Sequence, residues 1–209
     1  RNEGLQIEQL ITKRILDVVF SMVGLIVSSP FFVIIGLLIK CTDSGPIFYR
    51  QKRLTQGGKE FSICKFRTMI QDAEKEMGAR LAAENDERIL PVGKFLRRTR
   101  LDELPQLWNI LKGEMSVVGP RPERPELAKK IEEEIPEFSY RLKVKAGLTG
   151  YAQIYGKYNT TSYDKLKLDL KYIRNYSLFL DLRLILMTPK IMFMKESTEG
   201  IMEDDAKEI

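Results

Sequence analysis

The chain has 209 residues, with 34 Lys and Arg, 29 Asp and Glu, and a formal net charge of +5. This length predicts one domain of ordinary size, and the positive charge favours anionic partners, phospholipid headgroups more than nucleic acid. The sequence has no histidine, which excludes the commonest general base and metal ligand, and Cys41 and Cys64 lack metal-binding spacing, so any chemistry must use carboxylates, Lys, Arg or Tyr.

The first predicted element is the apolar run from Ile15 to Ile39, in which Asp17 is the one charged residue. As a helix rising about 1.5 Å per residue, it is long enough to cross a hydrocarbon core of about 30 Å. Proline lacks a backbone donor and disfavours helical geometry in the residue before it, so we expect a sharp bend at Ser29 and Pro30. The Ser28 and Ser29 hydroxyls are candidate partners for the backbone groups freed there, because lipid offers none.

Basic residues flank this run on both sides, namely Lys13, Arg14, Lys40, Arg50, Lys52 and Arg53. By the charge bias of membrane insertion both ends are cytoplasmic, so the segment would enter the membrane and return to the same face. The alternative is an ordinary spanning helix kinked at Pro30, and composition alone leaves the two arrangements equally open.

After the apolar run, residues 46–53 and 60–69 are rich in aromatic and β-branched residues. The glycine-containing stretch 55–58 separates them, which predicts a β-hairpin with Lys65 and Arg67 on one strand face. Residues 70–88 are highly charged and indicate an exposed helix or loop.

The second half of the chain predicts mainly helices. Apolar spacing and Pro105 indicate a helix that begins near Asp102 and ends at Gly113. Further helices are expected over residues 126–135 and 163–176. The remaining segments are a loop or short strand over 145–157, a strand or membrane-surface helix over 178–187, and a disordered acidic tail after residue 195.

The strongest chemical signal is the adjacent pair Asp102 and Glu103, which follows Arg97, Arg98 and Arg100. Acidic residues at a helix start are also explained by capping alone, and that explanation stays open. With the arginines, however, the same place can hold a phosphate ester against Asp102. Adjacent carboxylates also suit Mg²⁺, and an aspartate beside a metal-bound phosphate can act as a nucleophile.

Other cations are candidate phosphate ligands. Arg121 lies between two rigid prolines in the sequence Gly119-Pro120-Arg121-Pro122, which suits a preorganised clamp, although proline-rich surface turns are common. Lys65 is either a further phosphate ligand or an ordinary solvated strand residue.

The chain resembles the bacterial sugar transferases known as monotopic phosphoglycosyl transferases over about residues 12–195. Seven motifs in this order carry the resemblance: Lys13-Arg14, Ser29-Pro30, Lys65-Phe66-Arg67-Thr68-Met69, Leu101-Asp102-Glu103-Leu104-Pro105-Gln106, Gly119-Pro120-Arg121-Pro122, Gly147-Leu148-Thr149-Gly150 and Asp169. In that family the apolar run is a re-entrant helix bent at Ser-Pro, so the resemblance favours a hairpin in one leaflet.

The resemblance implies a ping-pong reaction. The aspartate, here Asp102, attacks the β-phosphate of a UDP-sugar, releases UMP, and holds the sugar phosphate until undecaprenyl phosphate accepts it. Asp102 and Glu103 would be the catalytic residues and the Mg²⁺ ligands. The residues implied to bind phosphate or nucleotide are Lys65, Arg97, Arg121, Lys145, Lys157 and Asp169.

Two of these positions depart from the family pattern. Lys145 and Lys157 stand where many relatives have arginine, and lysine keeps the charge but loses the bidentate fork. Asp169 matches a recurrent family aspartate, but its role does not follow from the sequence.

The expected fold is α/β, mostly helical, with a small β-hairpin or sheet, a re-entrant helix-break-helix and interfacial amphipathic helices. We expect an interfacial segment and membrane hairpin over 1–40, a cytoplasmic phosphoglycosyl transferase domain over 41–195, and the tail over 196–209. A chain that starts at Arg1 is expected to be the catalytic part of a longer family member.

The expected location is the cytoplasmic face of the bacterial inner membrane, in one leaflet. The expected partners are a UDP-sugar, undecaprenyl phosphate and membrane lipids, without nucleic acid, and a homodimer is an option for the longer protein. Two alternatives remain open: direct transfer in a ternary complex, in which Asp102 only binds Mg²⁺, and a non-catalytic scaffold that binds anionic lipid. No motif identifies the sugar.

Overall fold

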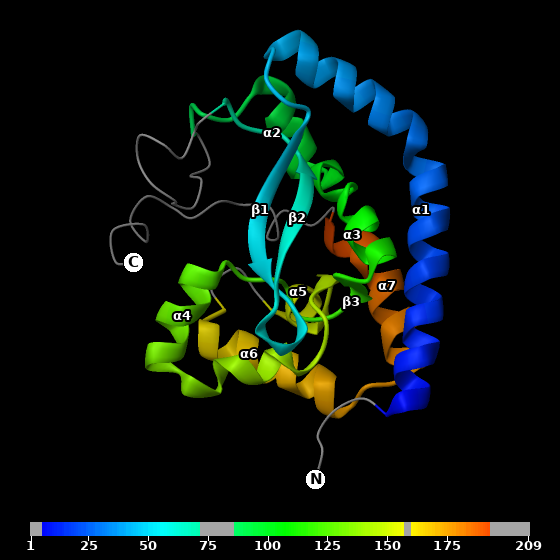
Figure 1. Cartoon of the computed structure of the whole chain (residues 1–209), viewed down its shortest axis with the longest axis vertical. Helices are drawn as coiled ribbons and strands as arrows, with labels where there is room; N and C mark the ends of the chain where they lie inside the picture. The colour runs from blue at the N-terminus through cyan, green and yellow to red at the C-terminus, as the bar shows by residue number, and fades with distance from the viewer. Residues whose placement is uncertain (1–5, 72–85, 157–159, 193–209) are drawn as a thin grey trace.

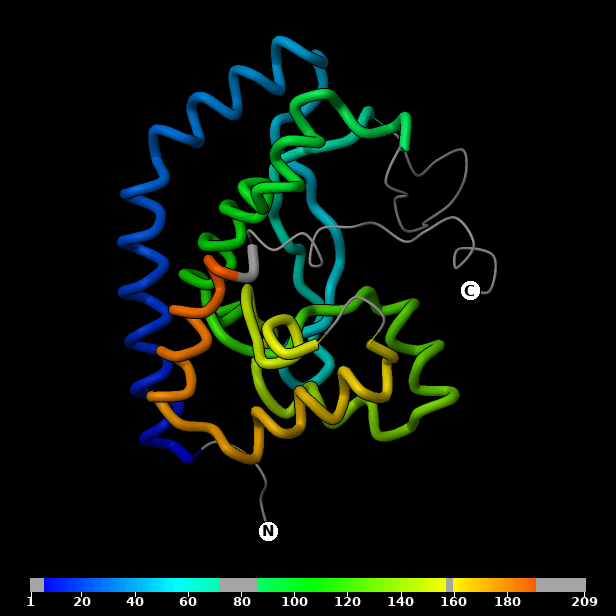
Figure 2. The backbone as a smooth tube through the Cα atoms, turned by 180° about the vertical axis from the view of Figure 1, so that it is seen from behind, coloured from blue at the N-terminus to red at the C-terminus, as the bar shows by residue number. Residues whose placement is uncertain are grey.

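The structure of the protein is a computed structural model that describes residues 6–71, 86–156 and 160–192. A long helix, α1, lies along one side of the molecule, and the rest of the described chain packs on its concave face (Figures 1 and 2). The elements in chain order are α1 (Ile7–Thr42), β1 (Phe48–Leu54), η1 (Gln56–Gly58), β2 (Glu60–Phe66), α2 (Pro91–Arg98), η2 (Leu101–Glu103), α3 (Gln106–Lys112), β3 (Ser116–Val118), α4 (Pro125–Glu134), η3 (Pro136–Lys143), β4 (Gly147–Thr149), α5 (Tyr151–Tyr155), α6 (Ser162–Arg174) and α7 (Leu178–Met192).

Helix α1 runs without interruption through Ser29 and Pro30, so the predicted division into two helices is wrong, but α1 does bend in its second half, in keeping with the bend expected there (Figure 1). Pro30 has no N–H to donate to the carbonyl of Ile26. The Ser29 hydroxyl donates to that carbonyl at 2.8 Å, and the Ser28 hydroxyl donates to the carbonyl of Gly24 at 2.6 Å. The Ser29 hydroxyl therefore supplies the partner predicted for the backbone group freed at Pro30, whereas the Ser28 hydroxyl adds a bond to a carbonyl that Pro30 does not free.

Most of the apolar surface of α1 faces away from the protein. The helix is long and apolar enough to cross a membrane, and only 22% of its most apolar window is buried. The core helix of a water-soluble domain would bury most of that window. The protein is therefore membrane-associated, while the re-entrant path and the interfacial helices remain predictions.

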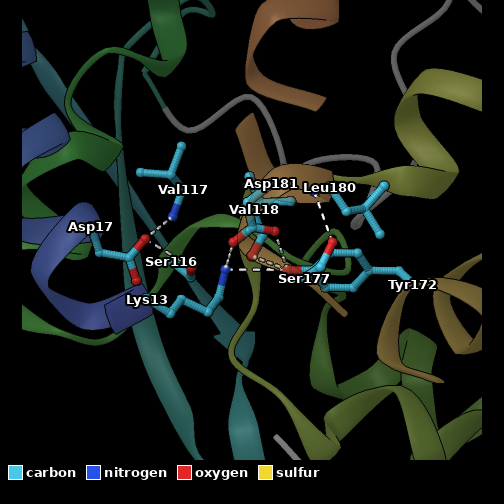
Figure 3. A network of polar contacts seen from close by, with 9 residues as sticks. All are labelled: Lys13, Asp17, Ser116, Val117, Val118, Tyr172, Ser177, Leu180 and Asp181. Carbon is cyan, nitrogen blue, oxygen red and sulfur yellow. Dashed lines mark hydrogen bonds and ion pairs between the residues drawn. The ribbon is translucent and has the colours of Figure 1, made fainter. Parts of the chain in front are cut away.

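Two charged residues near the start of α1, Lys13 and Asp17, face the protein (Figure 3). Lys13 Nζ donates to Asp181 Oδ2 at 2.7 Å and to the hydroxyl of Tyr172 at 3.2 Å. Asp17 Oδ1 accepts from the Ser116 hydroxyl at 2.9 Å and from the next backbone N–H at 2.8 Å. These buried bonds fix α1 to α6, α7 and β3, and they explain why the apolar run carries an acid.

Two small sheets and the helices around them form the core. Strands β1 and β2 pair antiparallel, with Phe48 opposite Phe66, which confirms the predicted hairpin. Strands β3 and β4 pair in parallel, with Ser116 opposite Gly147. The main core lies among β2, α3, the β3–β4 sheet, α6 and α7, and its most buried side chains are Ile110, Met115, Val118, Tyr172 and Leu184.

The predicted helix over 101–111 is wrong at its start. Leu101–Glu103 forms a separate 3₁₀ turn, and α3 begins only at Gln106. Pro105 cannot donate a backbone hydrogen bond, so the connection uses i→i−3 bonds, such as the one from the N–H of Leu107 to the carbonyl of Leu104 at 3.1 Å. The acidic pair thus lies in a tight turn before α3 and not at its N-terminus.

Other predictions had mixed outcomes. The helices expected over 126–135 and 163–176 are confirmed as α4 and α6, and the ambiguous segment 178–187 is helical in α7. The stretch 145–157 contains the short strand β4 and then the short helix α5. Most of the charged stretch 70–88 and all of the tail 196–209 lie outside the described residues.

Candidate active site

The acidic pair lies in a turn with an unusual backbone. Arg100 precedes it in the left-handed conformation, with φ 58° and ψ 12°, the one positive φ outside glycine in the described chain. This conformation is uncommon for a side chain with a Cβ and is found preferentially at functional sites. Arg100 lies between the end of α2 at Arg98 and the 3₁₀ turn that carries Asp102 and Glu103.

Glu103 gathers cations from three parts of the chain. Its Oε1 accepts from Lys65 Nζ at 2.8 Å and from Arg121 Nη2 at 2.9 Å, and Arg100 Nη1 lies 3.9 Å away. Burial alone would raise the pKa of Glu103, but the charges of Arg121, Lys65 and Arg100 outweigh it and hold that pKa well below its usual range. Glu103 is therefore a fixed anion within a positive cluster.

Asp102 has a different environment, although it is also buried. Its Oδ1 is enclosed and accepts no hydrogen bond from the described part of the chain. Burial and the neighbouring charge of Glu103 raise the pKa of Asp102 to about 6, against the opposing charges of Lys65, Arg100 and Arg97. A buried carboxylate oxygen without a donor is costly and rare, so it indicates a place for a ligand.

The chemistry of Asp102 suits a magnesium ion better than that of Glu103. Oδ1 of Asp102 has no hydrogen-bond partner among residues 6–71, 86–156 and 160–192, whereas Oε1 of Glu103 is already bound by cations. The described ranges hold no group of three or more carboxylates and thiols able to form a full protein cage. Mg²⁺ requires only one or two carboxylates when waters and substrate phosphates complete its shell, so Asp102 fits this ion.

The other predicted site residues are placed as follows. Lys65 and Arg121 contact Glu103 directly, and Arg97 is close enough for its charge to act on Asp102. Burial lowers the pKa of Lys145, with Arg14 and Lys13 of α1 among its charged neighbours, and no ion pair joins it to the acidic pair. Lys157 lies outside the described residues.

Asp169 is 1% exposed and faces the interior of the protein. Its Oδ2 accepts from Arg141 Nε at 3.0 Å and from Arg141 Nη2 at 2.8 Å. Burial raises the pKa of Asp169 to about 6, against the opposing charge of Arg141. The direct phosphate or nucleotide contact predicted for Asp169 does not fit this enclosed position.

Two residues of this region were not singled out from the sequence. Arg141 carries no local signal, because its partner Asp169 is 28 residues away. Arg14 was noted for its charge and as part of the motif Lys13-Arg14 but was given no role in the site, and its Nη1 and Nη2 donate to the carbonyls of Ile110 and Leu111, each at 2.7 Å. These bonds cap the end of α3 and connect α1 to the helix that follows the acidic pair.

The exposed apolar helix α1 indicates a membrane-associated protein. The acidic pair, with Lys65 and Arg121 on Glu103, indicates a site suited to phosphate esters. Residues 8–195 match the family model described as "Bacterial sugar transferase". The chain belongs to the bacterial sugar transferase family.

Curated relatives have consistent names. A UDP-N-acetylgalactosamine-undecaprenyl-phosphate N-acetylgalactosaminephosphotransferase of Aeromonas hydrophila is 38% identical over 84% of this chain and 42% of the relative. A UDP-glucose:undecaprenyl-phosphate glucose-1-phosphate transferase of Klebsiella pneumoniae is 40% identical over 90% of this chain and 41% of the relative. Exopolysaccharide production protein ExoY of Rhizobium meliloti is 38% identical over 84% of this chain and 83% of the relative. The chain thus spans less than half the length of the first two.

Proposed function

We propose that the protein transfers a sugar 1-phosphate from a UDP-sugar to undecaprenyl phosphate, giving a polyprenyl-diphosphate-sugar and UMP. The family and the names of the relatives support this reaction. The observation that carries the proposal is the buried Oδ1 of Asp102. This oxygen has no hydrogen-bond partner in the described chain, and it lies near cations that can hold phosphate. The product would start the assembly of a surface polysaccharide or glycoconjugate.

The proposed route passes through a covalent aspartyl-phosphosugar. A carboxylate oxygen of Asp102 attacks the β-phosphorus of the UDP-sugar, the bond from that phosphorus to the bridging oxygen breaks, and UMP leaves with the electron pair. A phosphate oxygen of undecaprenyl phosphate then attacks the same phosphorus and releases Asp102. Splitting the displacement in this way lets one site serve a soluble donor and a lipid acceptor in turn.

The cations make attack by one anion on another feasible. Lys65 and Arg121 are held on Glu103, and their remaining N–H groups can donate to oxygens of the transferred phosphate. Arg97 adds positive charge on the side of Asp102. Mg²⁺, held by Asp102, would neutralise further phosphate charge when bound.

The proposed location is the cytoplasmic face of the bacterial inner membrane, with α1 inserted in one leaflet. The exposed apolar face of α1 and the polar bonds of Lys13 and Asp17 to the domain support this arrangement. It would place Asp102 where a lipid phosphate and a soluble nucleotide can both reach it.

The test is UMP release by the purified protein with Mg²⁺ and a panel of UDP-sugars, with and without polyprenol phosphate, followed by intact-protein mass. Sugar-dependent UMP release with a phosphosugar adduct that is absent in Asp102→Asn supports the proposal and identifies the sugar. Turnover only with acceptor and without an adduct supports direct transfer. No turnover under any condition supports the non-catalytic scaffold.

A further inference from the structure

The segment between β3 and α4 has no regular secondary structure, yet its backbone is tightly held. Successive carbonyls from Pro120 to Glu123 each accept a hydrogen bond from another part of the chain. The donors are the Gly147 N–H at 2.9 Å, Arg141 Nη2 at 2.9 Å, Arg53 Nη1 at 3.3 Å and the Leu54 N–H at 3.0 Å. A segment held at every carbonyl has little freedom to move its side chains relative to the site.

Glycine makes the close approach on one side of this segment feasible. A Cβ at Gly119 would collide with the carbonyl of Lys145, and a Cβ at Gly150 would collide with the carbonyl of Gly119. The N–H of Gly119 donates to the carbonyl of Thr149 at 2.9 Å. Strand β4 and the residue after it therefore form a fixed wall for the loop.

Two of these donors are arginine side chains, and Arg141, which donates to the carbonyl of Arg121, is the buried one, whereas Arg53 is half-buried. Arg141 is 5% exposed, and its Nη2 donates both to Asp169 Oδ2 at 2.8 Å and to the carbonyl of Arg121 at 2.9 Å. The Phe138 ring lies 4.7 Å from the guanidinium carbon. Nη1 of Arg141 also lies 3.7 Å from Glu123 Oε1. Asp169, Phe138 and Glu123 thus orient the guanidinium whose Nη2 donates to the Arg121 carbonyl.

A buried ion pair is weak evidence for stability, because removing two charges from water costs about as much as their attraction returns. The pair Arg141–Asp169 is nearly fully enclosed, so its contribution to folding does not by itself explain the choice of charged residues. What an apolar pair of similar size cannot provide is the hydrogen bond to the Arg121 carbonyl.

We propose that Arg141 and Asp169 are positioning residues for Arg121. Asp169 orients Arg141, Arg141 fixes the backbone of Arg121, and the Arg121 guanidinium is thereby held on Glu103 Oε1 at 2.9 Å, where it can clamp phosphate. The pair reaches the reaction only through Arg121. This inference rests on the proposed function, since it assigns residues that prepare the phosphate clamp of that reaction.

The test replaces the charged pair with an apolar one, in the double variant Arg141→Met/Asp169→Leu of the full chain in lipid nanodiscs. The melting temperature should stay close to that of the wild type, because such replacements are often neutral. The kcat/KM for UMP release should nevertheless fall about 10- to 100-fold, the scale expected for a misplaced catalytic contact. If the pair has a purely structural role, a variant that keeps the wild-type melting temperature should also keep the wild-type kcat/KM.

A double-mutant cycle with Arg121→Gln tests whether the effect passes through Arg121. In the Arg121→Gln background, the apolar pair should reduce kcat/KM by less than about twofold further. If the reductions in kcat/KM caused by the apolar pair and by Arg121→Gln multiply in the combined variant, the inference is overturned. An apolar-pair variant with wild-type kcat/KM would also overturn it. The control is Ile173→Val, a core change one turn further along α6 that destabilises slightly and should leave kcat/KM unchanged.

Hydrogen–deuterium exchange separates this inference from the proposed function. In the apolar-pair variant, the amides of Gly147 and Leu54, which donate to the carbonyls of Pro120 and Glu123, and the amide of Gly119 should exchange at least about tenfold faster than in the wild type and in Ile173→Val. Unchanged exchange overturns the inference whatever the activity. A wild-type protein that releases no UMP, but whose variant shows this faster exchange, overturns the proposed reaction and leaves the positioning pair standing.

Discussion

Asp102 and Glu103 are adjacent in the chain and similarly buried, but their electrostatic surroundings are opposite. Glu103 Oε1 is bound by Lys65 and Arg121, whereas Asp102 Oδ1 has no partner in the described chain. The pKa of Glu103 is accordingly held well below its usual range and that of Asp102 is raised to about 6. When neighbouring carboxyls are separated in this way they serve different roles. Here Glu103 holds the cations, which fits the proposal that Asp102 is the residue that reacts.

The first prediction concerns the stability of Asp102→Asn. The wild-type carboxylate is charged at neutral pH, and its buried Oδ1 has no hydrogen-bond donor in the described chain, so the neutral amide should relieve a desolvation cost of about 2 kcal/mol. We expect a melting temperature equal to or higher than that of the wild type, measured without substrate, although turnover is lost. A lower melting temperature would mean that Asp102 is a structural cap.

The second prediction concerns Glu103→Gln, the matched change at the neighbouring residue. It removes the anion that holds Lys65 and Arg121 close together, so we expect a loss of about 2 kcal/mol in unfolding free energy. The KM for the UDP-sugar should rise, because two phosphate-binding cations lose their position. A variant as stable as Asp102→Asn, with unchanged KM, would contradict the role of Glu103 as organiser.

The third prediction is a pH dependence that follows from Asp102. Attack requires the carboxylate form, and the pKa of this group is about 6 rather than the ordinary value. At Mg²⁺ concentrations too low to saturate the site, kcat/KM should therefore rise with pH through a midpoint of about 6, and saturating Mg²⁺ should move that midpoint to lower pH, because the cation favours the carboxylate. Mg²⁺ binding, measured by calorimetry without substrate, should strengthen over the same range, because a metal ligand must be deprotonated. A flat profile from about pH 5 to 8 in both measurements would exclude Asp102 from both roles.

The fourth prediction concerns the attachment of α1. Lys13→Met leaves the Asp181 carboxylate buried without its cation, so it should destabilise the protein by about 3 kcal/mol or more. The double change Lys13→Met/Asp181→Leu should recover most of this loss in thermal unfolding, because no charge remains buried. Lys167→Met, which breaks an exposed pair with Asp164 on α6, is the control and should change little. A double variant no more stable than Lys13→Met would contradict this account.

Local patterns predicted the features of the fold that depend on neighbours in the sequence. The hairpin of β1 and β2 follows from strand residues around a glycine turn, and the serine partners of the Pro30 region follow from spacing within one helix. The parallel pairing of β3 with β4 and the partner of Asp169 depend on contacts between distant residues. No local pattern encodes such pairings.

The same limit applies to the candidate site. The motif around Asp102 and Glu103 singled out the acidic pair, but it did not reveal that Oε1 of Glu103 would be bound by cations and Oδ1 of Asp102 left without a donor in the described chain. That difference arises because β2 brings Lys65, and the loop before α4 brings Arg121, to the same oxygen of Glu103. The arrangement of the backbone thus gives two similar side chains different partners.

The last prediction addresses the bend of α1. Ser29→Ala should leave the Ile26 carbonyl without a donor and cost about 1 kcal/mol, whereas Ser29→Ala/Pro30→Ala should cost less, because an alanine in place of Pro30 restores the backbone N–H for that carbonyl. If Pro30 directs α1 back to the face it entered, a thiol at position 10, introduced as Leu10→Cys, and the native Cys41 should both react only from the cytoplasmic side. In the Pro30→Ala chain, a straighter helix should expose one of these thiols to a membrane-impermeant reagent outside intact cells. If one of the two thiols in the chain with the native Pro30 reacts from outside and the other from the cytoplasmic side, α1 spans the membrane. That result would contradict the proposed position of α1 in one leaflet.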